Sequence, residues 1–330
     1  MSRRKLMATV LVLAGFAAGQ AMAADRTVIK IGYGTAGGPI HEAALEFEKR
    51  IEKADPTIDV QVFPGGQLGS EGEIIGQLQA GLTDVLATTT GPLGQHNPVY
   101  YVLETPYVFI NEAQADKVLD GPVGAELLKA MEAKGLVGIA FWENGFRELT
   151  NNTRPIRAPG DLKGIKLRTQ QNRLQMKYFG DLGASPTPLA FTEIYNALAT
   201  RVVDGQENPL SLIATNKFYE QQKYVSKTDH VYSSVPVYYS KVKWDKLPAA
   251  TQKLVRDTIY DLRLWQRQRG RDQQQAYLDE IGKKSQIAIL TDAEKAEFQK
   301  AAAPAFDWAK KEYGTVYQTT LEKVLEAAAK

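Results

Sequence analysis

The sequence predicts an α/β protein made of two half-size domains. Its 330 residues exceed the size at which one hydrophobic core usually stops growing. Along the chain, short β-branched runs alternate with segments whose apolar residues repeat at helical spacing. The composition, with 44% hydrophobic and 24% charged residues, is that of an ordinary globular protein. The alternation of strand and helix favours parallel sheets with helices on both faces.

The individual elements are placed by their hydrophobic period. The first helix is the clearest, because Ile40, Ala43, Ala44, Phe47 and Ile51 fall on one helical face. A second segment of helical spacing covers residues 69–80. Alternating or β-branched runs predict strands at residues 27–32, 58–63, 85–90, 136–142 and 164–168.

A long helix is predicted over residues 248–284. Pro248 suits a first helical turn, and an apolar stripe runs from Leu254 to Trp265. The opposite face carries several arginines that nearby aspartates balance, so we expect it to face solvent and not a membrane. Gly270 is expected to bend this helix.

The first 23 residues have the three parts of a secretory signal peptide. Basic residues at positions 3–5 precede an apolar run over residues 6–18 and an Ala21-Met22-Ala23 end. The run is shorter than the roughly 20 residues that span a bilayer. We therefore predict export to the periplasm with cleavage near Ala23; a short buried helix is the alternative. Cleavage there removes three positive charges and takes the formal net charge from +2 to −1.

The composition excludes several classes of function. The chain has no cysteine, which rules out zinc fingers, iron–sulfur clusters and thiol-based catalysis. Because the chain has only three histidines, we predict neither a metal site nor a cofactor. The near-neutral charge gives no general attraction to nucleic acid, so no nucleic-acid partner is expected.

One glycine-rich segment resembles a dinucleotide-binding motif. Residues 32–37 fit the G-x-G-x-x-G pattern of dinucleotide-binding loops, with Asp55 and Asp59 at about the usual distance behind it. We set dinucleotide binding aside, because the chain is predicted to be exported and because Gly38 and Pro39 lengthen the loop before the helix. The amides of this loop can instead face a small anion at the start of the helix.

The sequence contains none of the common catalytic motifs. The G-x-S-x-G, H-E-x-x-H and P-loop patterns are missing from the sequence. Glu71 and Glu73 are two residues apart, so a helix would point them to different sides. We therefore predict that the protein is not an enzyme. An exported hydrolase with carboxylates dispersed along the chain is the less favoured alternative.

The middle of the chain carries a family resemblance. The ordered blocks are FPGGQLG at residues 63–69, GFRELTN at 145–151, RPI at 154–156, PGDLKGIKLR at 159–168, GASPTP at 183–188 and VDGQENP at 203–209. Together they resemble the extracytoplasmic solute-binding proteins of TRAP transporters, the C4-dicarboxylate-binding periplasmic protein family. The resemblance covers essentially the whole chain after the predicted signal peptide.

This resemblance implies a periplasmic-binding-protein-like, two-lobed clamshell with a long helix spanning both lobes. Lobe I would comprise residues 24–144 plus 234–273, and lobe II residues 145–233 plus 274–330. Such a protein is expected to act as a monomer, to close on a small carboxylate and to deliver it to the small and large membrane subunits. The exact acid stays open among four-carbon dicarboxylates, sugar acids and other hydroxy or aromatic acids. A ligand-presenting partner of a sensor is the alternative function.

Arg168 is the principal candidate for the ligand site. It ends a predicted strand, where open α/β sheets place their ligands, and it matches the carboxylate-binding arginine of the family. Its planar guanidinium can hold both oxygens of a carboxylate, which lysine cannot. Asn208 matches the second polar ligand residue of the family. Arg147 matches a further site arginine, or it forms a structural ion pair with a nearby glutamate.

The remaining candidates have supporting roles. Glu71 is expected to hold Arg147 in place without touching the ligand, and Phe191 is expected to supply an apolar wall. Thr88 and Thr89, together with Thr90, lie at a strand end and can hydrogen-bond the far end of the ligand. The other expected lining residues are Tyr33, His41, Trp142 and Gln171. Ser70 and Thr88 stand where sialic-acid-binding members carry acidic residues, which argues against sialic acid.

Overall fold

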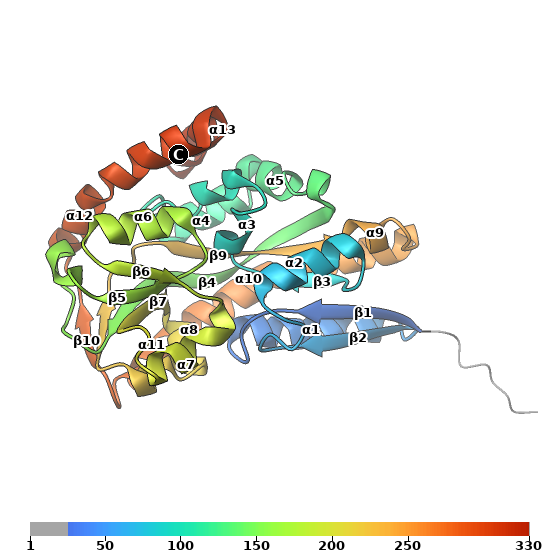
Figure 1. Cartoon of the computed structure of the whole chain (residues 1–330). Helices are drawn as coiled ribbons and strands as arrows, with labels where there is room; N and C mark the ends of the chain where they lie inside the picture. The colour runs from blue at the N-terminus through green and yellow to red at the C-terminus, as the bar shows by residue number, and fades with distance from the viewer. Residues whose placement is uncertain (1–25, 330) are drawn as a thin grey trace, which may run out of the picture.

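A β-sheet of parallel and antiparallel strands runs through the whole molecule, and helices cover both of its faces (Figure 1). The computed structural model describes residues 26–329, and the predicted signal peptide lies outside that range. The strands are β1 (Thr27–Gly32), β2 (Ile58–Phe63), β3 (Val85–Ala87), β4 (Leu136–Asn151), β5 (Lys166–Thr169), β6 (Ser185–Pro188), β7 (Gly205–Pro209), β8 (Tyr224–Lys227), β9 (Tyr232–Ser240) and β10 (Gln286–Ile289).

The helices begin where the sequence supplies caps or proline. Pro39 occupies the first turn of α1, and Ser70 and Glu73 form a capping box at the start of α2. The α-helices are α1 (Pro39–Ala54), α2 (Glu71–Ala80), α3 (Thr90–Leu93), α4 (Glu112–Leu119), α5 (Pro122–Lys129), α6 (Arg173–Asp181), α7 (Ile194–Ala199), α8 (Leu210–Thr215), α9 (Lys241–Trp244), α10 (Ala249–Asp272), α11 (Gln274–Ile281), α12 (Asp292–Ala301) and α13 (Ala303–Ala329). Short 3₁₀ turns are η1 (Pro98–Val102), η2 (Glu132–Lys134), η3 (Pro159–Leu162), η4 (Phe191–Glu193) and η5 (Phe218–Gln221).

Strand β4 joins the two halves of the sheet. Its residues 136–146 pair with β9, whereas residues 147–151 pair with β7 and β8. The main strand order is β2-β1-β3-β9-β4-β7-β5-β6, and β8 and β10 extend from β4 as a branch. The prediction of parallel sheets is therefore only partly right, because β9 runs antiparallel to β3 and β4, and β4 runs antiparallel to β7 and β8.

Three predicted strands differ in extent from the structure. The strand expected at residues 164–168 is β5, which runs from Lys166 to Thr169. The strand expected at residues 85–90 ends at Ala87, and Thr90 already opens α3. The strand expected at residues 136–142 continues to Asn151. This longer strand carries Arg147, so it brings a site residue into the sheet that the sequence prediction left outside.

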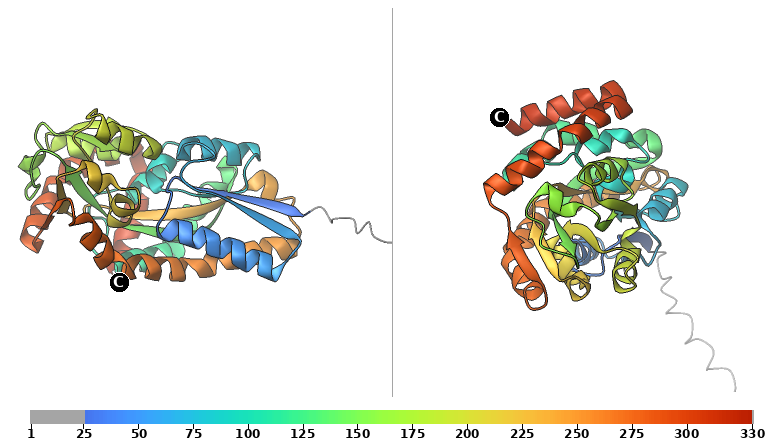
Figure 2. Two further views of the ribbon diagram at one scale, coloured as in Figure 1. Left: turned by 90° about the horizontal axis from the view of Figure 1, so that it is seen from below. Right: turned by 60° about the vertical axis from the view of Figure 1, so that its left-hand side comes forward.

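The predicted long helix is two helices in succession. α10 packs on α1 and β4, and α11 packs on α8 of the other half. Figure 2 shows α10 running along one side of the elongated molecule. The break lies at Gln273 and not at Gly270, where the bend was expected. Gly270 instead admits close packing, because a Cβ atom there would lie 3.4 Å from Cγ of Pro39.

The C-terminal helix α13 contacts both halves of the molecule. It packs against η1, α4 and α5 on one side and against α6 on the other. A kink at Gly314, with φ 67° and ψ −156°, lets the helix change direction along this course. The sequence prediction did not include this helix.

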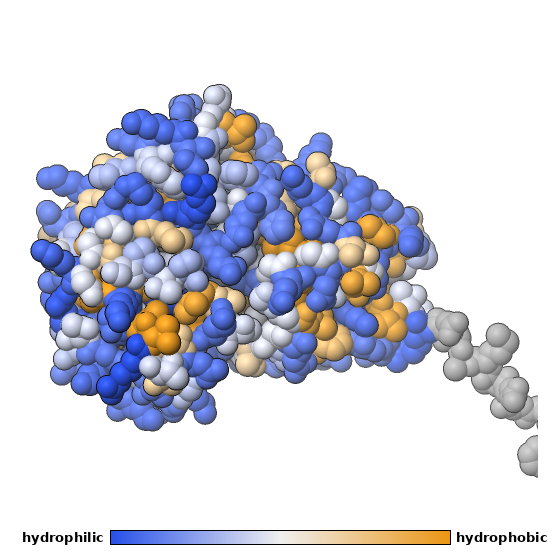
Figure 3. All heavy atoms as spheres, in the orientation of Figure 1, coloured by the Kyte–Doolittle hydropathy of each residue, from blue (hydrophilic) through white to orange (hydrophobic). Residues whose placement is uncertain are grey.

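Three clusters of buried apolar residues form the core, and the largest of them spans both halves. One lies between β1, α1 and α10, one among α7, α8 and α11, and the largest runs from α2 to α6 and α13. On the face in Figure 3 the surface is mainly hydrophilic, and hydrophobic residues form small separate groups. Among residues 26–329, no helix combines the length and the apolar character that a membrane crossing requires.

Candidate functional site

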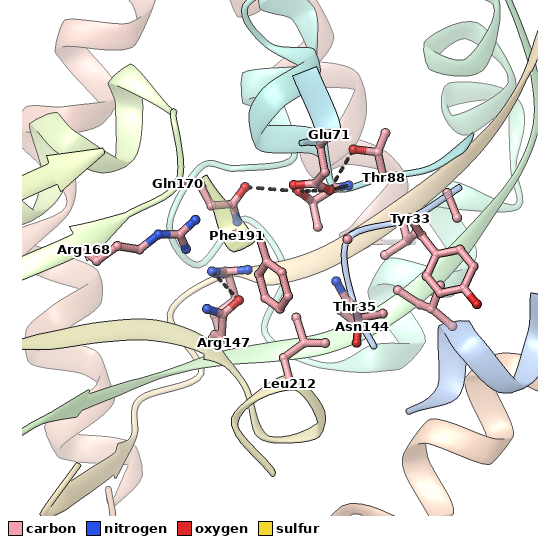
Figure 4. Close-up of a pocket in the computed structure, with 16 residues that line it drawn as sticks. Tyr33, Thr35, Glu71, Thr88, Asn144, Arg147, Arg168, Gln170, Phe191 and Leu212 are labelled. Carbon is pink, nitrogen blue, oxygen red and sulfur yellow. Dashed lines mark hydrogen bonds between the residues drawn. The ribbon is translucent and has the colours of Figure 1, made fainter. Parts of the chain in front are cut away.

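A cavity with about 420 Å³ of empty space lies where the two halves of the sheet meet (Figure 4). Segments that follow the carboxyl ends of β1, β3 and β5 open onto it, as expected for ligand sites of α/β sheets. We call it the ligand cavity. Its lining residues are Tyr33, Gly34, Thr35, Ile40, Glu71, Ala87, Thr88, Thr89, Asn144, Arg147, Arg168, Gln170, Phe191, Asn208, Leu212 and Val235.

Arg168 is a buried cation with an unused donor. Its side chain comes from β5 and is 2% exposed. Nε and Nη2 donate to the carbonyl oxygen of Leu189 at 3.0 and 2.6 Å, but Nη1 has no hydrogen-bond partner. Burial lowers the pKa of Arg168 to about 10, so the guanidinium stays charged at neutral pH. An unpaired buried donor of this kind costs free energy until a ligand satisfies it.

Arg147 is held in a buried network with Glu207. Its Nε and Nη2 donate to the two carboxylate oxygens of Glu207, the latter at 2.7 Å. His230 lies on the other side of that carboxylate, with Nε2 3.2 Å from Oε2. Burial alone raises the pKa of Glu207, but the charge of Arg147 and the hydrogen bond from His230 lower it to about 2. The charge of Arg147 is therefore already compensated within the protein.

This pairing corrects the role predicted for Glu71. Glu71 makes no contact with Arg147; its Oε1 instead accepts from Thr88 Oγ1 at 2.8 Å, from the Thr89 amide at 3.0 Å and from Thr89 Oγ1 at 3.2 Å (Figure 4). Its Oε2 has no hydrogen bond to any of residues 26–329. Glu71 therefore lines the ligand cavity itself, and the two threonines orient it.

Asn208 stands beside Arg147 at the end of β7. Its Oδ1 accepts from Arg147 Nη2 at 3.1 Å, and its Nδ2 donates to the side chain of Gln206. These bonds fix the amide plane, so one face of Asn208 is presented to the ligand cavity in a set orientation.

Most of the predicted site residues line the ligand cavity, and four do not. Trp142 lies in the core, where its indole nitrogen donates to the carbonyl of Ile259 at 3.2 Å. Gln171 is exposed, because the chain turns outward after β5. His41 does not line the ligand cavity, and its Nδ1 lies 2.6 Å from the hydroxyl oxygen of Tyr33, which does. Thr90, at the start of α3, donates to the buried Glu104. The predicted residues that do line the cavity are Tyr33, Glu71, Thr88, Thr89, Arg147, Arg168, Phe191 and Asn208.

Sequence reasoning missed Gln170, Asn144 and Thr35. Gln170 lies between Thr89 and Arg147, and the orientation that satisfies both atoms of its amide places its oxygen 2.8 Å from Arg147 Nη1. The sequence did contain a signal for Gln170 as a site residue, because it directly follows the end of β5 at Thr169. Asn144 lies in an irregular part of β4, between Glu143 and Gly145, which no hydrophobic period indicates.

The glycine loop at residues 32–37 contributes to this cavity through Gly34 and Thr35. Helix α1 begins only at Pro39, as the argument against a dinucleotide site required. Among the described residues 26–329, no group of three or more metal-ligating side chains is placed to hold a metal ion.

Comparison with known proteins identifies the family. Residues 32–312 match the family model of the bacterial extracellular solute-binding proteins, family 7 (DctP). The chain belongs to this family. It is 33% identical over 293 residues to the 2,3-diketo-L-gulonate-binding periplasmic protein YiaO of Escherichia coli, covering 88% of this chain and 89% of that protein. The resemblance to TRAP solute-binding proteins is thereby confirmed.

Solved structures agree with the two-lobed fold. The chain is similar to the sugar acid binding protein DctPAm of Advenella mimigardefordensis in complex with galactonate, with a TM-score of 0.89 and 35% identity over 92% of this chain and 98% of that one. It is also similar to a TRAP periplasmic solute-binding protein of Polaromonas bound to D-erythronate, with a TM-score of 0.86 and 37% identity over 91% and 98% of the two chains.

Proposed function

We propose that this solute-binding protein captures a hydroxylated monocarboxylic acid in the ligand cavity and delivers it to the membrane subunits of a TRAP transporter. The observation that carries the proposal is the unpartnered Nη1 of the buried Arg168. A ligand carboxylate would satisfy this donor and neutralise the buried charge. The galactonate and D-erythronate bound to two similar structures support the same ligand class.

The charges around the cavity favour one carboxylate over two. Arg147 is already paired with Glu207 and adds no free positive charge for a second carboxylate. Glu71 places an acidic side chain in the cavity wall, and its free Oε2 can accept from a ligand hydroxyl. A second ligand carboxylate near Glu71 would instead be repelled, which discriminates against dicarboxylates such as succinate.

Binding is proposed to close two lobes around the ligand. We assign residues 24–144 plus 234–273 to lobe I and residues 145–233 plus 274–330 to lobe II. The change of partner strands along β4 and the break between α10 and α11 support these boundaries. Helix α13 contacts elements of both lobes, so we place it across the outside of the hinge.

The remaining features of the proposal concern export and partners. We infer that residues 1–23 direct the chain to the periplasm and are cleaved near Ala23, which N-terminal sequencing of the periplasmic protein would test. We also infer that the protein acts as a monomer, binds no nucleic acid and leaves its ligand chemically unchanged. Size-exclusion chromatography and analysis of the ligand recovered after incubation would test the first and last of these points.

Isothermal titration of the protein, stripped of co-purified ligand, tests the ligand class. We expect galactonate or D-erythronate to bind at least about tenfold more tightly than succinate. Succinate binding as tightly as the better hydroxy acid would contradict the proposed class. Failure of all three to bind would contradict the proposed carboxylate role of Arg168.

A further inference from the structure

A second hollow lies directly outside the ligand cavity. It encloses about 880 Å³ of empty space, which includes open solvent, and we call it the outer groove. Its polar lining includes Tyr195, Asn216 and Lys217. Gly34 and Phe191 line both the ligand cavity and the outer groove, whereas every other lining residue belongs to one of them. The two spaces are therefore neighbours that meet at this pair of residues.

The ring of Phe191 forms the wall between the two spaces. It lies directly over Gly34, because a Cβ atom on Gly34 would be 3.5 Å from Cδ1 of Phe191. On the other side the ring meets the edge of Phe218, at 5.7 Å between centroids. Phe191 is partly buried and packs against the apolar cluster of α7, α8 and α11.

We propose that Phe191 is the specificity-determining residue that limits the size of the bound acid. This inference rests on the proposed function, since it assumes that the carboxylate occupies Arg168. The ring confines the ligand to the ligand cavity and excludes an acid whose chain carries a bulky substituent. Without the ring, such a substituent can extend into the outer groove, where polar side chains and the ring of Tyr195 would receive a sugar ring.

A matched pair of ligands tests this wall. Gluconate is an unsubstituted six-carbon hydroxy acid, and lactobionate is the same acid with a galactosyl group on O4. Both carry one carboxylate, so a difference in affinity reports size and not charge. We expect the parent protein to bind gluconate at least about tenfold more tightly than lactobionate. Phe191→Ala should lower this ratio by about tenfold or more, mainly by improving lactobionate binding.

Three further variants make the test specific. Leu212→Ala also removes apolar bulk from the ligand cavity, but Leu212 does not line the outer groove, so the ratio should stay near that of the parent. Phe191→Tyr keeps the ring and should also keep the parent ratio. If Phe191→Ala proves unstable, Phe191→Leu gives a smaller change in the same direction.

Each outcome decides the proposal. A parent protein that binds both acids equally would overturn it, as would an unchanged ratio in Phe191→Ala and Phe191→Leu. An equal gain of lactobionate binding in Leu212→Ala would show that general enlargement, and not the wall, sets the limit. A parent that binds neither gluconate, galactonate, D-erythronate nor succinate would overturn the proposed function, and the size limit with it.

Discussion

At the scale of single residues, the site depends on one unsatisfied buried cation. Arg168 has its Nε and Nη2 fixed on the carbonyl of Leu189, while Nη1 lacks a partner. Because the charge is held in position before the ligand arrives, little side-chain entropy is lost on binding. The unpaired Nη1 destabilises the free protein, and a bound carboxylate would remove this destabilisation.

Arg168→Ala is expected to lower the affinity for the preferred acid by about 30-fold to several thousandfold. This range corresponds to the roughly 2–5 kcal/mol lost when one partner of a buried charge pair is removed. Arg168→Lys should also fail, because it keeps the charge but loses the planar fork. Isothermal titration measures both, with circular dichroism as the control for folding. A variant that binds the acid as tightly as the parent would refute the proposal that Arg168 binds the ligand carboxylate.

Glu71→Gln tests whether the acidic wall selects against dicarboxylates. The amide removes the negative charge and keeps an oxygen that can accept from Thr88 and Thr89. We expect weaker binding of galactonate and stronger binding of succinate, so that the ratio of their affinities changes by about tenfold. Titration of both ligands into parent and variant gives this ratio. An unchanged ratio would mean that Glu71 does not contribute to the choice of ligand.

The sequence predicted residue types better than it predicted partners. Arg168 and Asn208 were recognisable from their motifs, and Arg168 also from its position at the end of a predicted strand. The partner of Arg147 was not, because Glu207 lies on a neighbouring strand whose pairing with β4 only the folded chain defines. Gln171 was chosen because it stands near a position at which sialic-acid-binding members of the family carry an asparagine. The structure instead buries the preceding residue, Gln170, in the cavity lining, because neighbouring side chains along an extended segment face opposite sides.

At the scale of elements, a buried carboxyl links two parts of the fold. Glu104 follows η1 and accepts hydrogen bonds from Asn172 at 3.0 Å and Gln175 at 2.9 Å, at the start of α6. Burial is the main reason that its pKa rises from 4.5 to about 7, although the charge of Arg147 and the hydrogen bonds work against this effect. Burial therefore favours the protonated form of Glu104, whereas the hydrogen bonds that tie η1 to α6 favour the carboxylate.

Glu104 makes stability depend on pH with a definite sign. Between pH 4.5 and about 7 the folded protein keeps a proton that the unfolded chain has released. The Glu104 contribution to the free energy of unfolding therefore falls as pH rises through this window, by up to about 1.4 kcal/mol per pH unit. Glu104→Gln, which cannot ionise, should be less sensitive. Chemical denaturation at about pH 5 and about pH 8 compares the two proteins, and identical pH dependence would contradict this account.

Hydrophobic period predicted the early elements well. β1 and β2 have the predicted bounds, and α1 begins one residue before the predicted apolar stripe. The break at Gln273 was missed because no proline or glycine marks it; the chain there passes from packing on α1 to packing on α8. Helix breaks that tertiary contacts impose are not visible in a local sequence pattern.

At the scale of the whole molecule, the PGG motif belongs to the contact between the lobes. Gly66 has φ 72°, and a Cβ atom there would lie 2.5 Å from Cγ2 of Thr192. Gly66 is in the loop between β2 and α2, and Thr192 is in η4, which directly precedes α7. The family motif thus permits a close backbone approach beside the outer groove, which Gly65 and Thr192 line.

Gly66→Ala is expected to hold the lobes apart and weaken binding without changing the cavity lining. We expect a loss of affinity of about tenfold, with partial recovery when Thr192→Ala is added, because the second change removes the clashing methyl group. Gly72→Ala is the control, since a Cβ atom there has no neighbour within 4 Å. Titration of the four proteins measures the coupling. No recovery in the double variant would assign the loss to local strain at Gly66.

The two-lobed architecture was predictable mainly from ordered motifs spread along the chain. The hydrophobic period and the chain length indicated two α/β halves, but they predicted a sheet of parallel strands only. The crossing strands β4 and β9 run antiparallel, and their pairing joins residues about a hundred positions apart in the sequence. Such long-range pairing depends on the whole fold, so local patterns carry little information about it.

The measurement that tests the central claim most directly compares galactonate with galactitol, which has the same hydroxyl-bearing chain without the carboxylate. A thermal-shift experiment on the ligand-stripped protein would use both at equal concentration. At about 1,000 times its dissociation constant a ligand stabilises the folded state by about 4 kcal/mol, which raises the midpoint by several degrees. We predict this rise with galactonate and none with galactitol. An equal rise with both would contradict recognition of a carboxylate by Arg168.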